Sequence, residues 1–381
     1  MATPSALRLS AAGAVLASAS CFTVPELKDD AALRDFDLPL AESHGEHLVD
    51  DEREVVRTTQ RTLLRLVALK HRLTDREPRA ARDVHAKQHG CARGELVVDA
   101  DVPVALRYGL FAAAGRYIAD VRFSTSEPGP YGDDWDTSLK GMGVKVRGVV
   151  GERFDVVGDD EDDTQDFAFN NRPMFPLRDV RDYGDAMMTR LLRYERGPLA
   201  DLGFAVGHAD RLPSLLLETN RVASPLLTTF HSQTPIAVGP QTTKMAFRPC
   251  RVRQAANAAP IVRANAFSSR DYLKERVQTD LGAADHCFEL VVQERPRADE
   301  SAFPVEDASV VWSVKEAPMV KVATLHLPRQ DITALSAQCD AWRINPWHSL
   351  VAHRPLGSLN RSRRALYDAL ATFRAAHAPT Q

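Results

Sequence analysis

The sequence predicts an α+β fold in which about eight antiparallel strands close into a barrel with helical insertions and a C-terminal helix. The 381-residue chain shows helical periodicity near both ends and in its middle, and a period of two in the segments between. Breaks rich in Gly and Pro separate these segments, as an antiparallel meander requires. With 44% hydrophobic residues, the chain can bury a large core without disulfides or structural metals.

Helices are predicted in three regions. Asp51–Thr74 repeats apolar residues at helical spacing, with Arg and Thr between them. Residues 177–230 show the same periodicity and are predicted to be an insertion between strand groups. The last helix, from about residue 359 to residue 376, brings Arg363 and Tyr367 onto one face because they lie four residues apart.

Strands are predicted where apolar and polar residues alternate or where short apolar runs lie between turns. The breaks at residues 128–132 and 148–151 separate the first of them. The total comes to roughly eight strands, the number at which side chains just fill a closed barrel. The predicted strands are Glu95–Asp99, Val121–Ser124, Gly143–Arg147, Asp166–Phe169, 243–253, 286–295 and 309–326.

Residues 51–381 are expected to form one domain, preceded by an N-terminal extension of residues 1–50. The first 25 residues weakly resemble an export signal, but Ser and Gly dilute their apolar part. We therefore expect the extension to be disordered or a weak signal, and a cytoplasmic location is favoured over export. No apolar run is long enough to span a bilayer, so no transmembrane segment is expected.

Charge and cysteine content narrow the class of protein. The 48 basic and 51 acidic residues nearly cancel, so no net field favours nucleic acid or an anionic membrane. The five cysteines are scattered, odd in number and free of C-x-x-C spacing. We therefore expect neither a zinc site nor a disulfide framework. A homo-oligomer is compatible with the sequence.

Three segments contain candidate functional residues, although each has a common structural explanation. His85 lies between an apolar helix and an apolar strand and should point inward, where a core histidine is commoner than a catalytic one. Asn170 ends a strand just before Pro173, which is typical of a turn. Tyr367 lies on an apolar helix face and could be a metal ligand only if positive charge, here from Arg363, favours its phenolate.

Taken together and in order, five segments resemble the motifs of one family, the haem catalases. The resemblance covers roughly residues 76–377. It implies a catalase-like barrel whose C-terminal helix carries the haem ligand. The matching segments are 82–87 for R-x-V-H-A-K, 121–125 for R-F-S-T, 141–146 for G-x-A-x-K-F, 170–179 for N-N-x-P-x-F-x-x-R-D, and 363–367 for R-x-x-x-Y.

The resemblance implies a distal side of three residues above a haem b group. His85 would be the catalytic acid and base, and Ser124 would orient its ring. Asn170 would donate a hydrogen bond to the bound peroxide. His89, four residues after His85, is predicted to lie at the surface rather than in a two-histidine metal site.

The resemblance also implies the proximal side and the haem anchors. Tyr367 would be the axial ligand of the iron, as in catalase, and Arg363 would hold it as a phenolate. The haem propionates would pair with Arg82, Arg122 and Arg374. The residues just before the last helix, Trp342, Trp347 and His348, are predicted to pack against it.

The chain departs from the catalase pattern in two ways that bear on the reaction. It ends 14 residues after Tyr367, where catalases continue, so it would be a minimal version. The acidic channel motif is replaced by Ser138-Leu139-Lys140-Gly141, which favours a wider or more apolar channel. Residues 345–361 are similar to small catalase-related proteins and to allene oxide synthases, which convert fatty-acid hydroperoxides. Those synthases have Thr before the distal histidine, whereas Val84 stands here, as in catalases.

Three functions follow as hypotheses. The first is a haem hydroperoxidase, a catalase or peroxidase, acting on hydrogen peroxide or organic hydroperoxides. The second is rearrangement of a lipid hydroperoxide on the same haem. The third is a non-catalytic haem-binding protein, against which the distal set of three residues argues.

Overall fold

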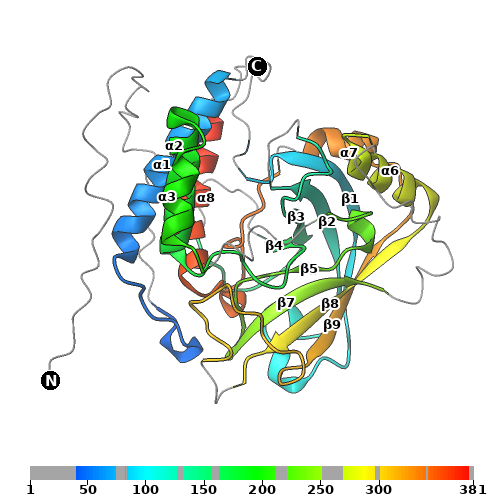
Figure 1. Cartoon of the computed structure of the whole chain (residues 1–381). Coiled ribbons are helices and arrows are strands. Elements are labelled where there is room, and N and C mark those ends of the chain that lie inside the picture. The colour runs from blue at the N-terminus through cyan, green and yellow to red at the C-terminus, as the bar shows by residue number, and fades with distance from the viewer. Residues whose placement is uncertain are drawn as a thin grey trace, which may run out of the picture.

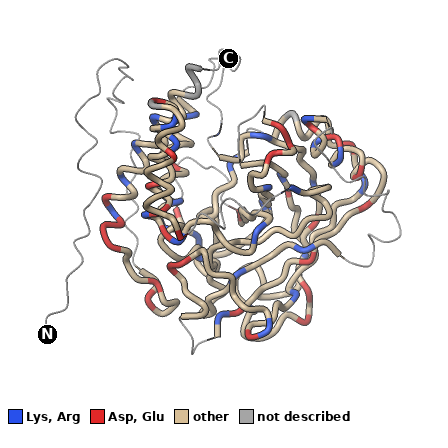
Figure 2. Tube along the Cα trace, in the orientation of Figure 1, with Lys and Arg blue, Asp and Glu red and all other residues tan. Residues whose placement is uncertain are grey.

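The fold consists of a β-barrel and a layer of long helices beside it (Figure 1). Both signs of charge occur on each part (Figure 2). A computed structural model describes residues 40–73, 82, 84–126, 132–155, 163–210, 221–250, 269–296, 301–339 and 342–376. The first 39 residues of the expected N-terminal extension lie outside this described part.

The sheet is antiparallel throughout and closes on itself. The order is β5-β4-β3-β2-β1-β9-β8-β7, and a further pairing of β5 with β7 completes an eight-stranded barrel, while β6 pairs with β7. This confirms the predicted closed barrel. The strands are β1 Lys87–Val98, β2 Gly115–Thr125, β3 Lys140–Arg147, β4 Thr164–Asn170, β5 Phe230–His231, β6 Ile236–Val238, β7 Gln241–Pro249, β8 His286–Glu294 and β9 Met319–Leu327.

Helices precede the barrel, interrupt it and follow it in the sequence. Among the helices of the described residues, none combines the length and apolar character needed to cross a membrane. The α-helices are α1 Glu52–Leu73, α2 Val180–Arg196, α3 Ala200–Gly207, α6 Tyr272–Ala283, α7 Thr333–Gln338 and α8 Ser358–Ala376. Short 3₁₀ turns are η3 Glu42–His44, η4 Val104–Leu106, η5 Gly109–Phe111, η6 Pro225–Leu227 and η8 Val351–His353.

Apolar stripes hold the helical layer together. On α1, Val56, Leu63 and Leu66 are at most 1% exposed, which confirms the amphipathic helix predicted there. Leu63 and Leu66 pack with Met187 of α2 and Leu366 of α8. These contacts hold α8 in place beside the barrel.

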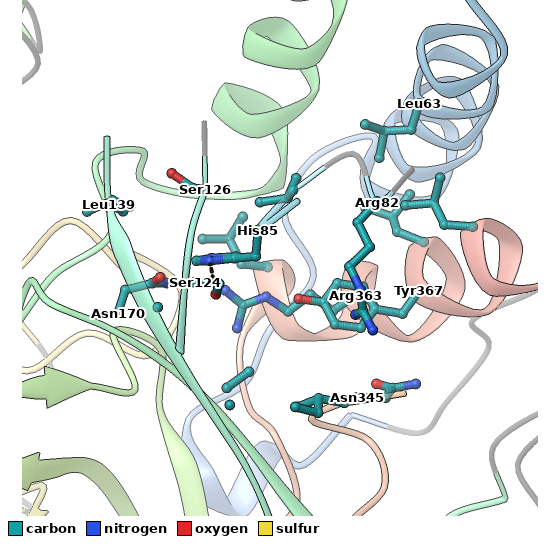
Figure 3. A pocket seen from close by; sticks show the side chains of 18 of the residues that line it. Leu63, Arg82, His85, Ser124, Ser126, Leu139, Asn170, Asn345, Arg363 and Tyr367 are labelled. Carbon is teal, nitrogen blue, oxygen red and sulfur yellow. Dashed lines mark hydrogen bonds between the residues drawn. The ribbon is translucent and has the colours of Figure 1, made fainter. Parts of the chain in front are cut away.

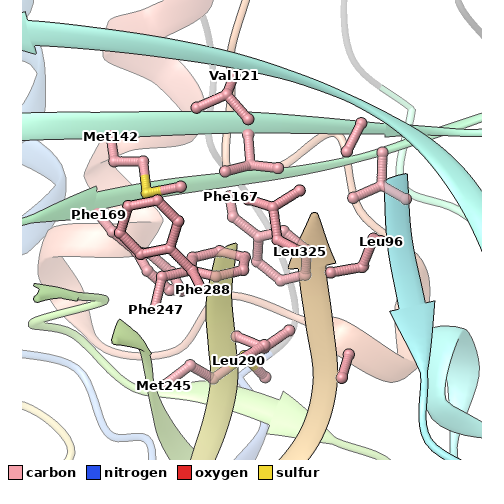
Figure 4. Close-up of a cluster of buried hydrophobic side chains, with 14 of the residues drawn as sticks. Leu96, Val121, Met142, Phe167, Phe169, Met245, Phe247, Phe288, Leu290 and Leu325 are labelled. Carbon is pink, nitrogen blue, oxygen red and sulfur yellow. The ribbon is translucent and has the colours of Figure 1, made fainter. Parts of the chain in front are cut away.

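Alternate side chains of the strands point into the barrel and fill it, and those between them point to its outer face. On β2, Val121 and Phe123 are fully buried in the barrel core, and Phe167 and Phe169 of β4 join the same cluster (Figure 4). Successive side chains of a strand point to opposite faces, so the residues between these point outward. On β2 the outward positions include Arg122.

Two predicted elements differ from the structure. The strand predicted over 309–326 begins only at Met319, because Pro318 lacks the N–H that a ladder needs. The predicted helical insertion 177–230 ends earlier, at Gly207 among the described residues, and α6 was not predicted. Helix α6 packs Val277 and Leu281 against the barrel core. The periodicity of the sequence did not reveal this helix.

The expectation of no disulfide framework was wrong. Disulfides join Cys91 to Cys339 and Cys250 to Cys287. Their partners are 248 and 37 residues apart in sequence, and their Cα atoms are 6.4 and 5.6 Å apart. Close pairing depends on the closed barrel and its attached segments, so the spacing of cysteines along the chain could not predict it.

The surface position predicted for His89 was also wrong. Its side chain is fully buried, with Nε2 2.6 Å from Thr125 Oγ1 and Nδ1 3.5 Å from Asp134 Oδ1. The pairing of β1 with β2 slips between Gln88 and Gly90, so His89 is the extra residue of a bulge. A bulge turns a side chain away from the regular alternation, which explains the burial.

Candidate functional site

A cavity of about 520 Å³ lies between the outer face of the barrel and the helical layer. Strands β2, β3 and β4 contribute to one side, and α1, α2 and α8 to the other. The structure therefore gathers residues that the sequence spreads from position 82 to position 374. All eight residues predicted to form the site line this cavity: Arg82, His85, Arg122, Ser124, Asn170, Arg363, Tyr367 and Arg374.

Strand register sets three positions of the site side by side. Ser124 of β2 pairs with Gly141 of β3, and Gly141 pairs with Asn170 of β4. Directly opposite residues of antiparallel strands project to the same face, and neighbouring strands lie about 4.8 Å apart. Ser124 and Asn170 therefore flank a position that has no side chain.

The His85 ring uses the space that Gly141 leaves. A Cβ atom on Gly141 would lie 2.4 Å from both Cε1 and Nδ1 of that ring. Ser124 Oγ lies 3.1 Å from His85 Nδ1 (Figure 3). The backbone of His85 has the uncommon positive φ of 58°, and its carbonyl accepts a 3.0 Å hydrogen bond from Arg122 Nη1. These contacts fix the ring over the β2–β4 face.

Its surroundings keep His85 neutral at physiological pH. Removal from solvent, followed by the charges of Arg122 and Arg363, lowers the pKa of His85 to about 3. A neutral imidazole can take a proton from a bound ligand and return it. Arg82 also opposes its protonation, and these three arginines would do so less when an anionic ligand pairs with them.

A second amide holds Asn170. Asn170 Nδ2 donates a 2.8 Å hydrogen bond to Gln233 Oε1, and Gln233 Nε2 donates a 2.8 Å hydrogen bond to the Met174 carbonyl. Gln233 is fully buried and has a φ of 63°. The sequence did not reveal Gln233, because it lies 63 residues from Asn170 and belongs to none of the matched motifs.

Helix α8 supplies the opposite part of the site. Arg363 and Tyr367 project from it into the cavity (Figure 3). Arg363 Nη1 donates to Asn360 Oδ1 at 2.9 Å and to Thr234 Oγ1 at 3.3 Å. Within the described residues, the hydrogen bonds of Arg363 go to Asn360 and Thr234, and none joins it to the Tyr367 hydroxyl.

The cavity is rich in arginine. Asp368 is the single carboxylate among its described lining residues. Burial, followed by the charges of Arg343 and Arg122, lowers the pKa of Arg374 to about 10. In the described part of the chain Arg374 has no ion-pair partner, so this end of the cavity suits a ligand with carboxylates. The six arginines are Arg82, Arg122, Arg190, Arg343, Arg363 and Arg374.

The residues before α8 have mixed roles. Trp347 is fully buried and donates a 2.7 Å hydrogen bond to the Asn360 carbonyl, which confirms its predicted packing role. His348 lines the cavity instead of only packing, with Nδ1 3.4 Å from Asp166 Oδ2. Across the described residues, no group of three or more His, Cys, Asp or Glu side chains is arranged to bind a metal ion.

Apolar side chains cover much of the remaining surface of the cavity. Leu63, Tyr183 and Met187 approach it from the helical layer. Leu139 lies in the segment that replaces the acidic catalase motif, and it also lines the cavity. This lining can accept an organic group as well as a small polar ligand.

The structure is a closed antiparallel barrel with an arginine-lined cavity between its outer face and the helical layer. Three solved catalases have a similar fold. A bacterial catalase is 20% identical with a TM-score of 0.54, over 88% of this chain and 62% of that one. A fungal catalase is 17% identical with a TM-score of 0.52, over 91% and 66%. Catalase A from Saccharomyces cerevisiae is 16% identical with a TM-score of 0.51, over 90% and 67%.

The chain therefore has the catalase-like fold that the motifs of its sequence predicted. It spans between 62% and 67% of the length of these three catalases. No protein-family model matches the sequence, and no curated protein matches it.

Proposed function

We propose that this protein is a haem-dependent hydroperoxidase, a catalase or peroxidase, that acts on hydrogen peroxide or organic hydroperoxides. One observation carries the proposal: the segments that resemble the catalase motifs meet around a single cavity. His85, Ser124 and Asn170 line it from the barrel side, while Arg363 and Tyr367 line it from α8. The catalase-like fold supports the same conclusion.

The residues of the cavity fit haem b. Its two propionates require cationic partners, and Arg82, Arg122 and Arg374 line the cavity. The buried guanidinium of Arg374 lies near Arg343 and Arg122 without an acidic partner among the described residues, an arrangement that an anionic ligand would stabilise. The phenol of Tyr367 is a known type of haem ligand. The arginines and the phenol together supply partners for the propionates and for the iron of a haem.

The haem would supply a redox-active iron that cleaves the peroxide O–O bond. His85 would carry a proton from one peroxide oxygen to the departing one, a transfer that contributes roughly 10²–10⁴-fold to such reactions. Ser124 would fix the ring through Nδ1, and Asn170 would hydrogen-bond the peroxide. Arg363 lies one helical turn before Tyr367 and would add a positive charge to the same side of the cavity.

A second function, rearrangement of a fatty-acid hydroperoxide, is supported by one feature of the cavity. Its apolar lining, which includes Leu139 and Met187, would accommodate an acyl chain. Val84 argues for the hydroperoxidase, since the rearranging enzymes that the sequence resembles have Thr at that position. A non-catalytic haem-binding protein would have no need for Ser124 and Asn170 beside His85.

The deciding experiment compares two substrates on the haem-loaded protein, with free haem at equal concentration as the control. Oxygen release and peroxide consumption are measured with hydrogen peroxide and with a polyunsaturated fatty-acid hydroperoxide. Rapid oxygen release from hydrogen peroxide identifies a catalase, and consumption that requires an added reductant identifies a peroxidase. Loss of the lipid hydroperoxide without oxygen or reductant would favour rearrangement instead. Turnover no faster than that of free haem would contradict both enzymatic functions.

A further inference from the structure

Arg343 lines the cavity but lies outside the five segments that resemble catalase motifs. It is part of the connection between α7 and α8, and it is half-buried. Within the described residues its side chain makes no hydrogen bond and no ion pair. A guanidinium group has five N–H donors and no acceptor, so these donors are left for a ligand or for solvent in the cavity.

Arg374 of α8 is the second arginine in this condition. It lines the same cavity, and its side chain also makes no hydrogen bond or ion pair within the part of the chain that the structure describes. Burial lowers the pKa of Arg374 to about 10, and Arg343 is the charged group that lowers it most, ahead of Arg122. The two guanidinium groups therefore lie close enough to repel each other. A carboxylate between them would offset this repulsion and accept hydrogen bonds from both.

The backbone on both sides of Arg343 is anchored. Arg82 Nη2 donates a hydrogen bond to the carbonyl of Trp342, the residue immediately before Arg343. Two residues after Arg343, the backbone N–H of Asn345 donates a 3.0 Å hydrogen bond to Asp166 Oδ2 on β4. The guanidinium group of Arg343 thus extends from a fixed stretch of backbone, so less conformational entropy is lost when it binds a ligand.

We propose that Arg343 and Arg374 form a pair that binds one carboxylate, a propionate of the haem. Arg82 and Arg122 each use one guanidinium nitrogen on a backbone carbonyl and remain as partners for the second propionate. Arg343 and Arg374 retain all of their donors, and planar guanidinium groups bind carboxylates through parallel hydrogen bonds. The identity of the ligand rests on the proposed haem-dependent function, whereas the repulsion within the pair is a property of the chain alone.

The first test measures the stability of the haem-free full-length protein by urea denaturation. Arg343→Met keeps an unbranched apolar side chain and removes the charge, so Arg374 loses the charge that opposes it most. The denaturation midpoint should therefore rise, whereas the loss of an arginine with a structural role would lower it. Arg329→Met is the matched control, since Arg329 is exposed after β9 and is not part of the cavity lining; it should leave the midpoint unchanged. An unchanged or lower midpoint in Arg343→Met would overturn the proposal.

The second test titrates the same proteins with haem and with its dimethyl ester, in which both propionates are uncharged. Arg343→Met should weaken haem binding by about tenfold or more, which corresponds to one hydrogen bond between charged groups, but should bind the ester as the wild type does. Arg343→Lys, which keeps the charge without the planar fork, should bind haem with intermediate affinity. Equal haem affinity in the wild type and Arg343→Met, or the same deficit for both ligands, would overturn the proposal. Failure of the wild type to bind haem would contradict the proposed function instead, and the urea midpoints would still decide whether Arg343 and Arg374 form a pair.

Discussion

Replacing Gly141 with alanine adds one methyl group at the point where the His85 ring approaches the barrel. The new Cβ would lie 2.4 Å from His85 Cε1 and Nδ1 and 3.1 Å from Ser124 Oγ. Carbon atoms in contact are normally about 3.5–4.0 Å apart, so the ring must move by about 1 Å or more. A misplacement of about 1 Å can cost roughly 10²-fold in rate. The shift also breaks the hydrogen bond between His85 and Ser124.

Turnover of hydrogen peroxide per bound haem therefore should fall roughly 100-fold in Gly141→Ala, with haem content largely retained because the arginines and Tyr367 are untouched. The matched control is Gly282→Ala in α6, where an added Cβ meets nothing within 4 Å. This control should keep full turnover and gain up to about 1 kcal/mol of stability, since alanine favours a helix over glycine. Wild-type turnover per haem in Gly141→Ala would refute the inferred position of the catalytic ring.

Three further outcomes are expected. His85→Ala should bind haem at wild-type stoichiometry but lose peroxide turnover, and retained turnover would contradict its role as the acid and base. Removal from solvent lowers the pKa of the fully buried His353 to about 4 from its ordinary 6.5, so the folded protein resists its protonation. The free energy of unfolding should therefore fall as the pH drops below 6.5, and this histidine should account for a loss of about 3 kcal/mol by pH 4. His353→Gln should lack that part of the loss. Equal losses in the two proteins, measured by denaturant unfolding, would refute this. Replacing the Cys91–Cys339 pair by alanines should lower the free energy of unfolding by about 2–4 kcal/mol, and an unchanged denaturation midpoint would argue against that disulfide.

The barrel could be predicted because its signals are local. Alternation in segments such as Val121–Ser124 and Asp166–Phe169 reflects a strand with one face in the core, and the structure confirms strands at both. The last helix was also predicted well, since its apolar stripe and the spacing of Arg363 and Tyr367 both lie within one segment. The eight proposed site residues were found through motifs, and the structure brings them to one cavity.

Features that depend on contacts between distant segments could not be predicted. Gln233 accepts a hydrogen bond from Asn170 across 63 residues of sequence, and nothing in its neighbouring residues indicates this. The burial of His89 results from a bulge that appears only when β1 pairs with β2. The Cys91–Cys339 disulfide likewise depends on a contact across 248 residues. Sequence pattern identifies elements and motifs, whereas these details follow from how the elements meet.

The central claim is that the cavity holds haem on Tyr367, and haem binding by Tyr367→Phe tests it most directly. The matched control is Tyr183→Phe, which removes a phenol oxygen from α2 on the same cavity. Haem is titrated into the purified protein, and the bound fraction after gel filtration is measured by absorbance. The proposed site predicts stoichiometric binding by the wild type and by Tyr183→Phe, and loss of stable binding by Tyr367→Phe. Equal haem content in all three proteins would contradict the assignment of Tyr367 as the iron ligand.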